Sequence, residues 1–422
     1  MKKILVFFYS LSLSISLLAQ AGCTDPKANN YDANATVNDG SCTYNTTDLI
    51  PQFRTVLHDD LEEISAMIEY NHRIFGLADS GNPHSIYEFD TITGDILQTK
   101  KLKGTENEDW ESMTRDDSFV YVGDTGNNKH GNRKDLVIYR FPISDLDIAG
   151  DIPNDHIERI YYHYEDQTDF TSLPKNTTRY DCESIIAMGD SLYLFSKDWQ
   201  QFITRYYTIP KEPGNYSAIL HDSLNVSGIV TDATNIGDST VVLLGSFLLG
   251  DSFIELLFDF NGQDVFSGNK RQIIVKHEKL GQPESITLNS QFTGFIGTES
   301  FKFGGTPQKQ ALFSYSIKDF LSNTVAIPAL LDASNPLIIY PNPPKGDQVS
   351  IQIPDNLSPG YNSISWVNTQ GKVLDSHFLP LYSKGKTITY TIPAHEGVGL
   401  HYIVLQDKVK KYVGKIKISG NQ

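Results

Sequence analysis

Acidic residues recur along the middle of the chain, each at the start of a short apolar stretch. The intervals between successive acids are 48, 72, 49 and 52 residues. Carboxylates gathered at one place repel one another unless they are protonated or bridged by a cation, and calcium accepts several such oxygens at loose geometry. The pattern predicts a calcium site built from five side chains: Glu63, Glu111, Glu183, Asp232 and Glu284. The alternative is that each acid bonds nearby backbone or an arginine, and only one or two face a common centre.

Each of these acids opens a two-stranded unit. The clearest copy runs from Trp110 through a polar turn at residues 115–118 to Asp124. Third and fourth strands rich in aromatic and β-branched residues follow, and a repeat of about fifty residues is typical of a four-stranded propeller blade. We therefore predict an all-β fold whose central part, residues 50–328, is a five-bladed β-propeller. A sixth blade would need a repeat that the sequence does not show.

The last repeat has no fourth strand of its own, whereas residues 52–58 form a strand without a blade. We predict that these two parts pair, because closing the ring removes the exposed edges of an open sheet.

A hairpin returns the chain to the place where it started, so the ends of the second strands are predicted to lie at the same rim as the acids. A charged loop at residues 127–134 follows one of these ends and could face an anion, although such loops are more often simply solvated. The predicted ligand-binding rim comprises Asp79, Asp124, Asn127, Lys129, Arg133 and Lys197. No catalytic residue is assigned, because the sequence has no P-loop, nucleophile elbow or HExxH motif.

The first residues of the chain predict where the protein is located, and its net charge indicates which partners it does not bind. Two lysines, an apolar run at residues 4–18 and a small-x-small site predict a signal peptide over residues 1–21. We expect an exported chain with no transmembrane segment after cleavage, secreted or held at the outer cell surface; lipidation of Cys23 is the rival interpretation. The net charge of -16 argues against a nucleic-acid partner.

The segment that follows, residues 22–44, is rich in Asp and Asn and cannot bury a core of its own. Cys23 and Cys42 flank it and are the predicted disulfide pair of the three cysteines, whereas Cys182 is predicted to be a buried thiol. Its Gly-Cys-Thr-Asp-Pro start and Asp-Gly-Ser-Cys end resemble a short calcium-binding module similar to thrombospondin type 3 repeats. That resemblance implies calcium ligands at Asp25, Asp32, Asn34 and Asp39; a polar loop without metal is the alternative.

The last part of the chain, residues 338–422, is predicted to be a small Ig-like β-sandwich after a linker at residues 329–337. It carries Tyr340-Pro341-Asn342-Pro343, a turn motif at residues 368–373 and a basic ending at residues 415–418. These features resemble the type A C-terminal sorting domain of the type IX secretion system. The resemblance implies that the type IX secretion machinery is a partner.

Three of the acids stand in a common Glu-Ser context, at Glu111-Ser112, Glu183-Ser184 and Glu284-Ser285. This context resembles the inner strands of five-bladed soluble calcium-activated nucleotidases (apyrases), which implies a central calcium held by Glu and Ser residues, with Ser65 as an alternative to Glu63. We predict an exported binding protein that recognises an extracellular small molecule, glycan or peptide at its rim and has a structural calcium. The alternative is a calcium-dependent extracellular hydrolase of phosphoesters or glycans.

Overall fold

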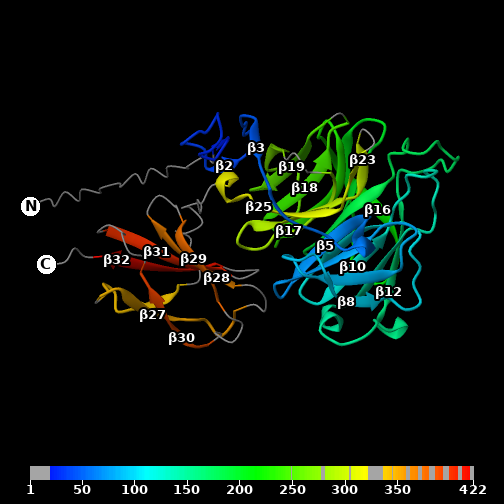
Figure 1. The fold of residues 1–422 in the computed structure, drawn as a ribbon. Coiled ribbons are helices and arrows are strands. Elements are labelled where there is room, and N and C mark those ends of the chain that lie inside the picture. Colours follow the sequence, from blue (N-terminus) through cyan, green and yellow to red (C-terminus); the bar gives the residue numbers. More distant parts are fainter. Residues whose placement is uncertain are drawn as a thin grey trace, which may run out of the picture.

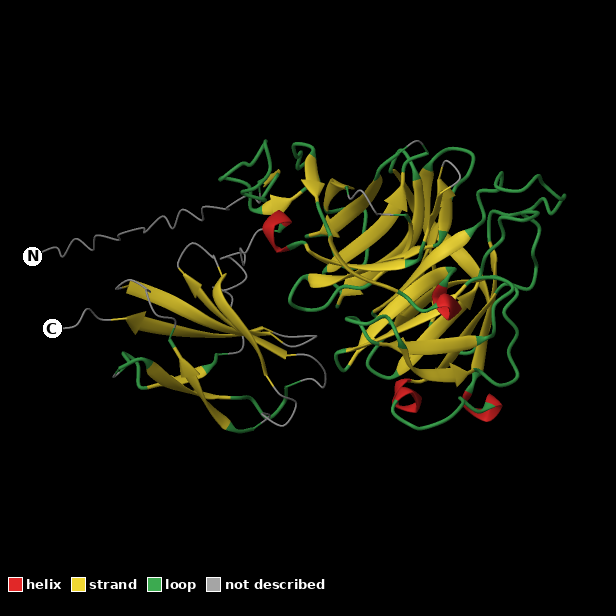
Figure 2. Ribbon diagram, in the orientation of Figure 1, coloured by secondary structure: helices red, strands yellow, loops and turns green. Residues whose placement is uncertain are grey.

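The computed structural model describes residues 20–248, 250–276, 281–303, 306–321, 336–344, 346–357, 362–368, 373–379, 385–392, 399–406 and 411–418. The predicted signal peptide lies outside these residues except for its last two positions, and so does most of the predicted linker. Figure 2 shows that strands dominate, and the described helical elements are 3₁₀ turns of three or four residues. Within the described residues, no helix has the length and apolar character needed to cross a membrane.

The central part of the chain forms antiparallel sheets in which consecutive strands are neighbours (Figure 1). The first sheet is β5 (Ile64–Tyr70), β6 (Arg73–Ala78), β7 (Ser85–Phe89) and β8 (Ile96–Lys101). The second run is β9 (Trp110–Arg115), β10 (Phe119–Asp124), β11 (Val137–Pro142) and β12 (Glu158–Tyr164). The third run is β13 (Cys182–Met188), β14 (Ser191–Ser196), β15 (Ile203–Pro210) and β16 (Gly214–Asn225). The fourth is β17 (Ile229–Ile236), β18 (Thr240–Ser246), β19 (Ser252–Phe258) and β20 (Asn269–Val275).

The remaining strands of this part are β21 (Gln282–Ile286), β22 (Thr293–Glu299) and β25 (Ala311–Ser316), and a short hairpin, β23 (Phe301–Phe303) with β24 (Thr306–Gln308), precedes β25. Strand β4 (Gln52–Val56) pairs antiparallel with β25, and the rings of Phe53 and Phe313 meet edge to face at 5.7 Å. The predicted closure by residues 52–58 is therefore confirmed over residues 52–56.

The sheets are arranged around a common centre. The first strand of each run contacts the first strand of the next, from β5 to β9, β13, β17 and β21 and back to β5. Hydrophobic clusters lie between successive sheets in the same circular order, for example Phe75 of β6 with Met113 of β9. Burial of these facing apolar surfaces drives the sheets together. The fold is therefore all-β and propeller-like, as predicted.

Two sheet contacts were not expected from the sequence. The outer strands β12 and β16 pair in parallel and join two runs into one eight-stranded sheet. Strand β3 (Thr47–Leu49) pairs in parallel with β20 and becomes the fifth strand of the sheet formed by β17 to β20. These contacts cover outer edges that would otherwise offer unpaired backbone groups.

The N-terminal segment is held against the central part. The predicted disulfide between Cys23 and Cys42 is confirmed, and short parallel strands β1 (Ala21–Gly22) and β2 (Val37–Asn38) lie within the segment. The Lys27 ammonium donates to the Asp319 carbonyl at 2.6 Å, near η4 (Lys318–Phe320). The Asn38 amide donates to the Asp259 carbonyl at 3.0 Å. The segment thus packs on the molecule although it has almost no core.

The described residues after 335 form two antiparallel sheets with a core of their own around Trp366. One sheet has β26 (Ile338–Tyr340), β27 (Gln348–Gln352) and β30 (Thr387–Thr391). The other has β29 (Val373–Leu379), β28 (Asn362–Asn368), β31 (Gly399–Gln406) and β32 (Lys411–Ile418). The predicted strands of this part are present, and the assignment to an Ig-like sandwich stays a prediction.

Candidate functional site: a carboxylate ring and a rim pocket

A β-bulge occurs near the start of every innermost strand, where one residue is skipped in the pairing with the second strand. The skipped positions are equivalent in the five hairpins: Ser65, Glu111, Glu183, Thr231 and Glu284. A bulge re-aims the side chain it carries and is common beside functional sites. The five positions define what we call the carboxylate ring, which contains three glutamates and two hydroxyl residues.

The hydroxyl members of the ring bind the neighbouring sheet. Ser65 Oγ donates to the Trp110 carbonyl and Thr231 Oγ1 to the Pro283 carbonyl, both at 2.9 Å. Each of these carbonyls belongs to the residue before the next ring glutamate. The hydroxyls therefore fix the backbone that positions Glu111 and Glu284.

A lysine enters the ring from the end of a second strand. The Lys197 Nζ lies 2.5 Å from Glu183 Oε2 and 3.9 Å from Glu284 Oε2, and the lysine side chain is only 7% exposed. Although burial lowers the pKa of the Lys197 ammonium, Glu183, Glu284, Asp181 and Glu111 outweigh it and raise that pKa above its usual value. The sequence predicted Lys197 at an open rim, whereas the structure directs its charge into the ring.

The ring is short of positive charge. With three ionised glutamates and one ammonium, its net charge is about two negative units. Burial first, then the nearby Glu183, raises the pKa of Glu111 well above its usual value. Glu183 Oε1 and the hydroxyls of Ser112, Ser184 and Ser285, which follow the ring glutamates, are buried and find no hydrogen-bond partner among the described residues. Unpaired buried oxygens of this kind are costly unless a cation or water binds them.

Two of the five predicted ring acids occupy other positions. Glu63 is exposed, precedes β5 and accepts a hydrogen bond from the Asn82 amide at 2.9 Å. Asp232 follows the bulge in β17, and its carboxylate accepts the backbone N–H groups of Ile286 and Ala233 at 2.7 and 2.8 Å. Backbone contacts therefore explain Asp232 without a ligand. As metal ligands the five acids remain a prediction.

Further carboxylates surround the mouth of the ring. Asp79, at the end of the first hairpin, lies beside Glu63, and Glu299 lies opposite Gln282 at the start of β21. Burial first, then neighbouring carboxylates, raises the pKa of Asp79 to about 7 and that of Glu299 to about 8. These values indicate a mouth in which burial, and then the neighbouring acids, favour the protonated form of both carboxyl groups.

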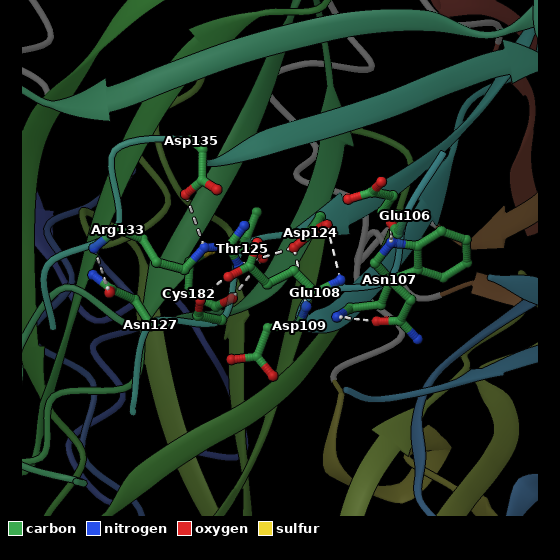
Figure 3. Close-up of polar contacts among 12 residues, drawn as sticks. Glu106, Asn107, Glu108, Asp109, Asp124, Thr125, Asn127, Arg133, Asp135 and Cys182 are labelled. Carbon is green, nitrogen blue, oxygen red and sulfur yellow. Dashed lines mark hydrogen bonds and ion pairs between the residues drawn. The ribbon is translucent and has the colours of Figure 1, made fainter. Parts of the chain in front are cut away.

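At the rim, Asp124 organises the loops around it (Figure 3). Its carboxylate accepts the backbone N–H groups of Glu108 and Asp109 at 3.3 and 3.1 Å, and Arg133 Nη1 at 2.9 Å. Arg133 also bonds Asp135 through Nε at 3.1 Å. The side chain of Asn127 accepts Arg133 N and donates to the Tyr180 carbonyl. Asp124 and Asn127 therefore hold the rim loops in place, which is a positioning role.

A pocket of about 200 Å³ opens between these loops. Predicted residues Asn127, Lys129 and Arg133 line it, together with His130 of the charged loop that was expected to face an anion. Asp109 and Lys175 also line it, and the sequence analysis missed both. Lys175 comes from the loop at residues 166–179, which lies within the long 72-residue interval between Glu111 and Glu183. That loop is anchored by the Leu173 and Asn176 N–H groups, which donate to the His130 and Asn128 carbonyls at 2.8 Å.

Asp109 is the lining residue of the pocket whose protonation is most relevant to its chemistry. Figure 3 shows its carboxylate turned away from Asp124. It packs against Gly126, where a Cβ would approach Asp109 Oδ2 to 2.4 Å, so glycine is required there. Burial first, then the nearby Asp181, raises the pKa of Asp109 to about 6. The pocket thus combines amine groups with one carboxyl group that can change its protonation near neutral pH.

In the N-terminal segment, backbone turns use the predicted calcium ligands. Asp25 accepts the Lys27 N–H and the Tyr44 hydroxyl at 2.9 and 2.8 Å. Asp32 accepts both the N–H and the side-chain amide of Asn34, and Asp39 accepts the Ser41 N–H at 3.0 Å. These are Asx-type contacts. Across the described part of the chain, no three His, Cys, Asp or Glu side chains are gathered as a ready-made metal site.

Comparisons with known proteins identify no family. No family model matches the chain. Over 39 residues it is 54% identical to the chloroplastic ribulose bisphosphate carboxylase/oxygenase activase of Spinacia oleracea. That stretch is 9% of this chain and only 8% of the length of that protein.

Solved structures share low similarity with the chain. A PQQ-bound aldose sugar dehydrogenase from Streptomyces coelicolor has a TM-score of 0.39 at 10% identity, covering 63% of this chain and 97% of that one. An α-L-arabinofuranosidase from Podospora anserina, in complex with cellotriose, has 0.36 at 10%, covering 64% and 97%. A β-fructofuranosidase from Bombyx mori has 0.34 at 9%, covering 89% and 88%. At these TM-scores no function is inferred, and the propeller-like class rests on the strand connectivity described above.

Proposed function

We propose that this chain is an exported five-bladed propeller protein that binds a small anionic extracellular ligand in its rim pocket. The single observation that supports this function is the pocket between the 126–134 and 166–179 loops, which is lined by Lys129, His130 and Lys175. Lys129 and Lys175 are exposed, and neither amine forms an ion pair among the described residues, although Glu108 and Asp109 line the same pocket. Amines free of internal partners can bind a phosphate or carboxylate group.

Ligand binding can be tested with defined anions. Inorganic phosphate, glucuronate and a nucleoside monophosphate would be titrated by calorimetry into wild type and into a Lys129→Met/Lys175→Met double variant. We expect at least one anion to bind the wild type and to lose on the order of tenfold or more in affinity in the variant. Lys134→Met is the matched control, because Lys134 is exposed on the same loop but packs over Phe170. Equal binding by both variants would contradict the pocket assignment.

The carboxylate ring is the proposed calcium site. Its donor set fits a hard cation, since Glu183 Oε1 is buried without a partner among the described residues and the ring carries about two negative charges when its three glutamates are ionised and Lys197 is counted. Glu111, Glu183 and Glu284 would supply carboxylate oxygens, and a bound calcium ion would neutralise their repulsion. The acids of the N-terminal segment fit less well, because one oxygen of each of Asp25, Asp32 and Asp39 already accepts a backbone N–H in a turn.

A hydrolase is the second candidate function, and the raised pKa of Asp109 favours it. A carboxyl group with a pKa of about 6 can exchange a proton at neutral pH. Phosphate release from nucleotides, with calcium or with chelator, tests this possibility, and Asp109→Asn should abolish it. If no phosphate is released from nucleotides in the presence of calcium, nucleotide hydrolysis is excluded.

Export by the type IX secretion machinery is proposed from the two ends of the chain. A chain cut after residue 337 should stay inside a type IX-competent host, whereas the full chain should reach the medium or cell surface. Export of the shortened chain would contradict the role given to the last domain.

A further inference from the structure

We propose that Lys197 is the resident counter-ion of the carboxylate ring, and that a divalent cation must displace its ammonium to enter. The inference rests on the proposed calcium site. It adds that the ring has two alternative occupants, one of which belongs to the chain itself.

The ammonium already takes the oxygens that the metal would need. Lys197 Nζ is 2.5 Å from Glu183 Oε2 and 3.9 Å from Glu284 Oε2, and these two glutamates are 3% and 10% exposed. A calcium ion binds carboxylate oxygens at about 2.3–2.6 Å. An ion bound to both glutamates would stand within a few ångströms of the ammonium, where like charges repel strongly in a buried site. The two cations therefore compete.

An aromatic ring already contacts the ammonium in its present position. Lys197 Nζ lies 5.0 Å from the centroid of the Trp199 ring, and a lysine stem is flexible enough to move its head between neighbouring positions. An ammonium over an indole face is stabilised by a cation–π interaction. The indole is fixed, because Trp199 Nε1 donates to Asp181 Oδ2 at 2.8 Å. Movement of Lys197 toward or away from this ring would change the fluorescence of Trp199.

Calcium affinity in three variants of the full chain tests the competition. Lys197→Met removes the charge and keeps an unbranched side chain, Lys197→Arg keeps the charge, and Lys211→Met removes a lysine paired with Asp116 at 3.0 Å outside the ring. Equilibrium dialysis with radioactive calcium gives the affinity. The Trp199 signal, obtained by subtracting a Trp199→Phe variant, reports the movement of Lys197.

We expect Lys197→Met to bind calcium on the order of tenfold or more tightly than wild type, with the other two variants close to wild type. Calcium should change the Trp199 fluorescence of wild type but not of Lys197→Met.

If wild type and Lys197→Met bind calcium equally, the competition is overturned while the calcium site stands. If only Lys197→Met binds, the competition is supported, and calcium is excluded as the natural occupant. If neither wild type nor Lys197→Met binds calcium, both the calcium site and the competition are overturned. Should Lys197→Met not fold, an unchanged Trp199 signal in calcium-saturated wild type would also overturn the competition.

Discussion

Two groups of acidic residues in this chain are predicted to hold calcium, and their carboxylate oxygens have different partners in the structure. In the N-terminal segment, Asp32 and Asp39 are near the surface and accept backbone N–H groups two residues ahead. In the carboxylate ring, Glu183 is buried, one of its oxygens has no partner within the described chain, and its other oxygen bonds a lysine.

The difference shows that two acidic regions with similar sequence predictions can give their carboxylates different partners. An Asp that closes a turn has one of its carboxylate oxygens bonded to its own backbone. A Glu carried by a bulge at the meeting point of several sheets has no such backbone partner. It needs a counter-charge from elsewhere, and here part of that charge comes from Lys197.

The largest effect should come from breaking the ring's ion pair. Glu183→Gln leaves the buried Lys197 without its nearest carboxylate, so we expect a loss of about 3–5 kcal/mol in the free energy of unfolding. Urea denaturation measures it. Glu63→Gln, at an exposed acid outside the ring, is the control and should change stability by less than about 0.5 kcal/mol. Similar losses of unfolding free energy in both variants would contradict the different roles given to Glu183 inside the ring and Glu63 outside it.

The N-terminal segment should depend more on its disulfide than on metal. A Cys23→Ser/Cys42→Ser variant loses the cross-link that closes a loop with a sequence separation of 19, which is worth about 3 kcal/mol for a loop of this length. Limited proteolysis of the segment should become faster in this variant. Chelator added to the disulfide-bonded wild type should leave the proteolysis of this segment unchanged; faster cleavage would show that calcium does hold it.

The mouth of the ring should make stability depend on pH. The pKa values of Asp79 and Glu299 are raised to about 7 and 8 in the folded protein, whereas unfolded carboxyl groups ionise near 4. The folded state therefore binds more protons in this range, and stability falls as pH rises from about 4 to 8. The thermal midpoint, measured at pH 5 and pH 8, should be lower at pH 8. Calcium should reduce the difference if it enters the ring, and a midpoint that rises with pH would contradict this charge crowding.

The smallest effect is expected at Asp39. Asparagine can accept the same Ser41 N–H, so Asp39→Asn should leave the free energy of unfolding close to that of wild type. The calcium response of the thermal midpoint should equal that of wild type. A reduced response would return Asp39 to the group of metal ligands and weaken the contrast between the two acidic regions.

Much of the fold was predictable because it follows from local patterns. Alternation and turn residues predicted the hairpins, and the unmatched strand at residues 52–58 predicted its pairing with the last sheet. The disulfide followed from two cysteines that flank one small polar segment. The parallel contacts of β3 and β12 were not predictable, because they join outer strands that are distant in sequence and carry no motif.

The sequence by itself determined the strands, the repeat and the acidic character of the centre. Only the tertiary structure decided which residues share the ring. A bulge shifts side-chain direction by one position, so Ser65 and Thr231, and neither Glu63 nor Asp232, are equivalent to Glu111. Tertiary structure also turned Lys197 inward and brought Lys175 to the pocket. The loop that carries Lys175 is held by contacts with a segment far away in the chain. Lys197 turns toward Glu183 of its own hairpin and toward Glu284 of a distant strand, and no local pattern encodes that direction.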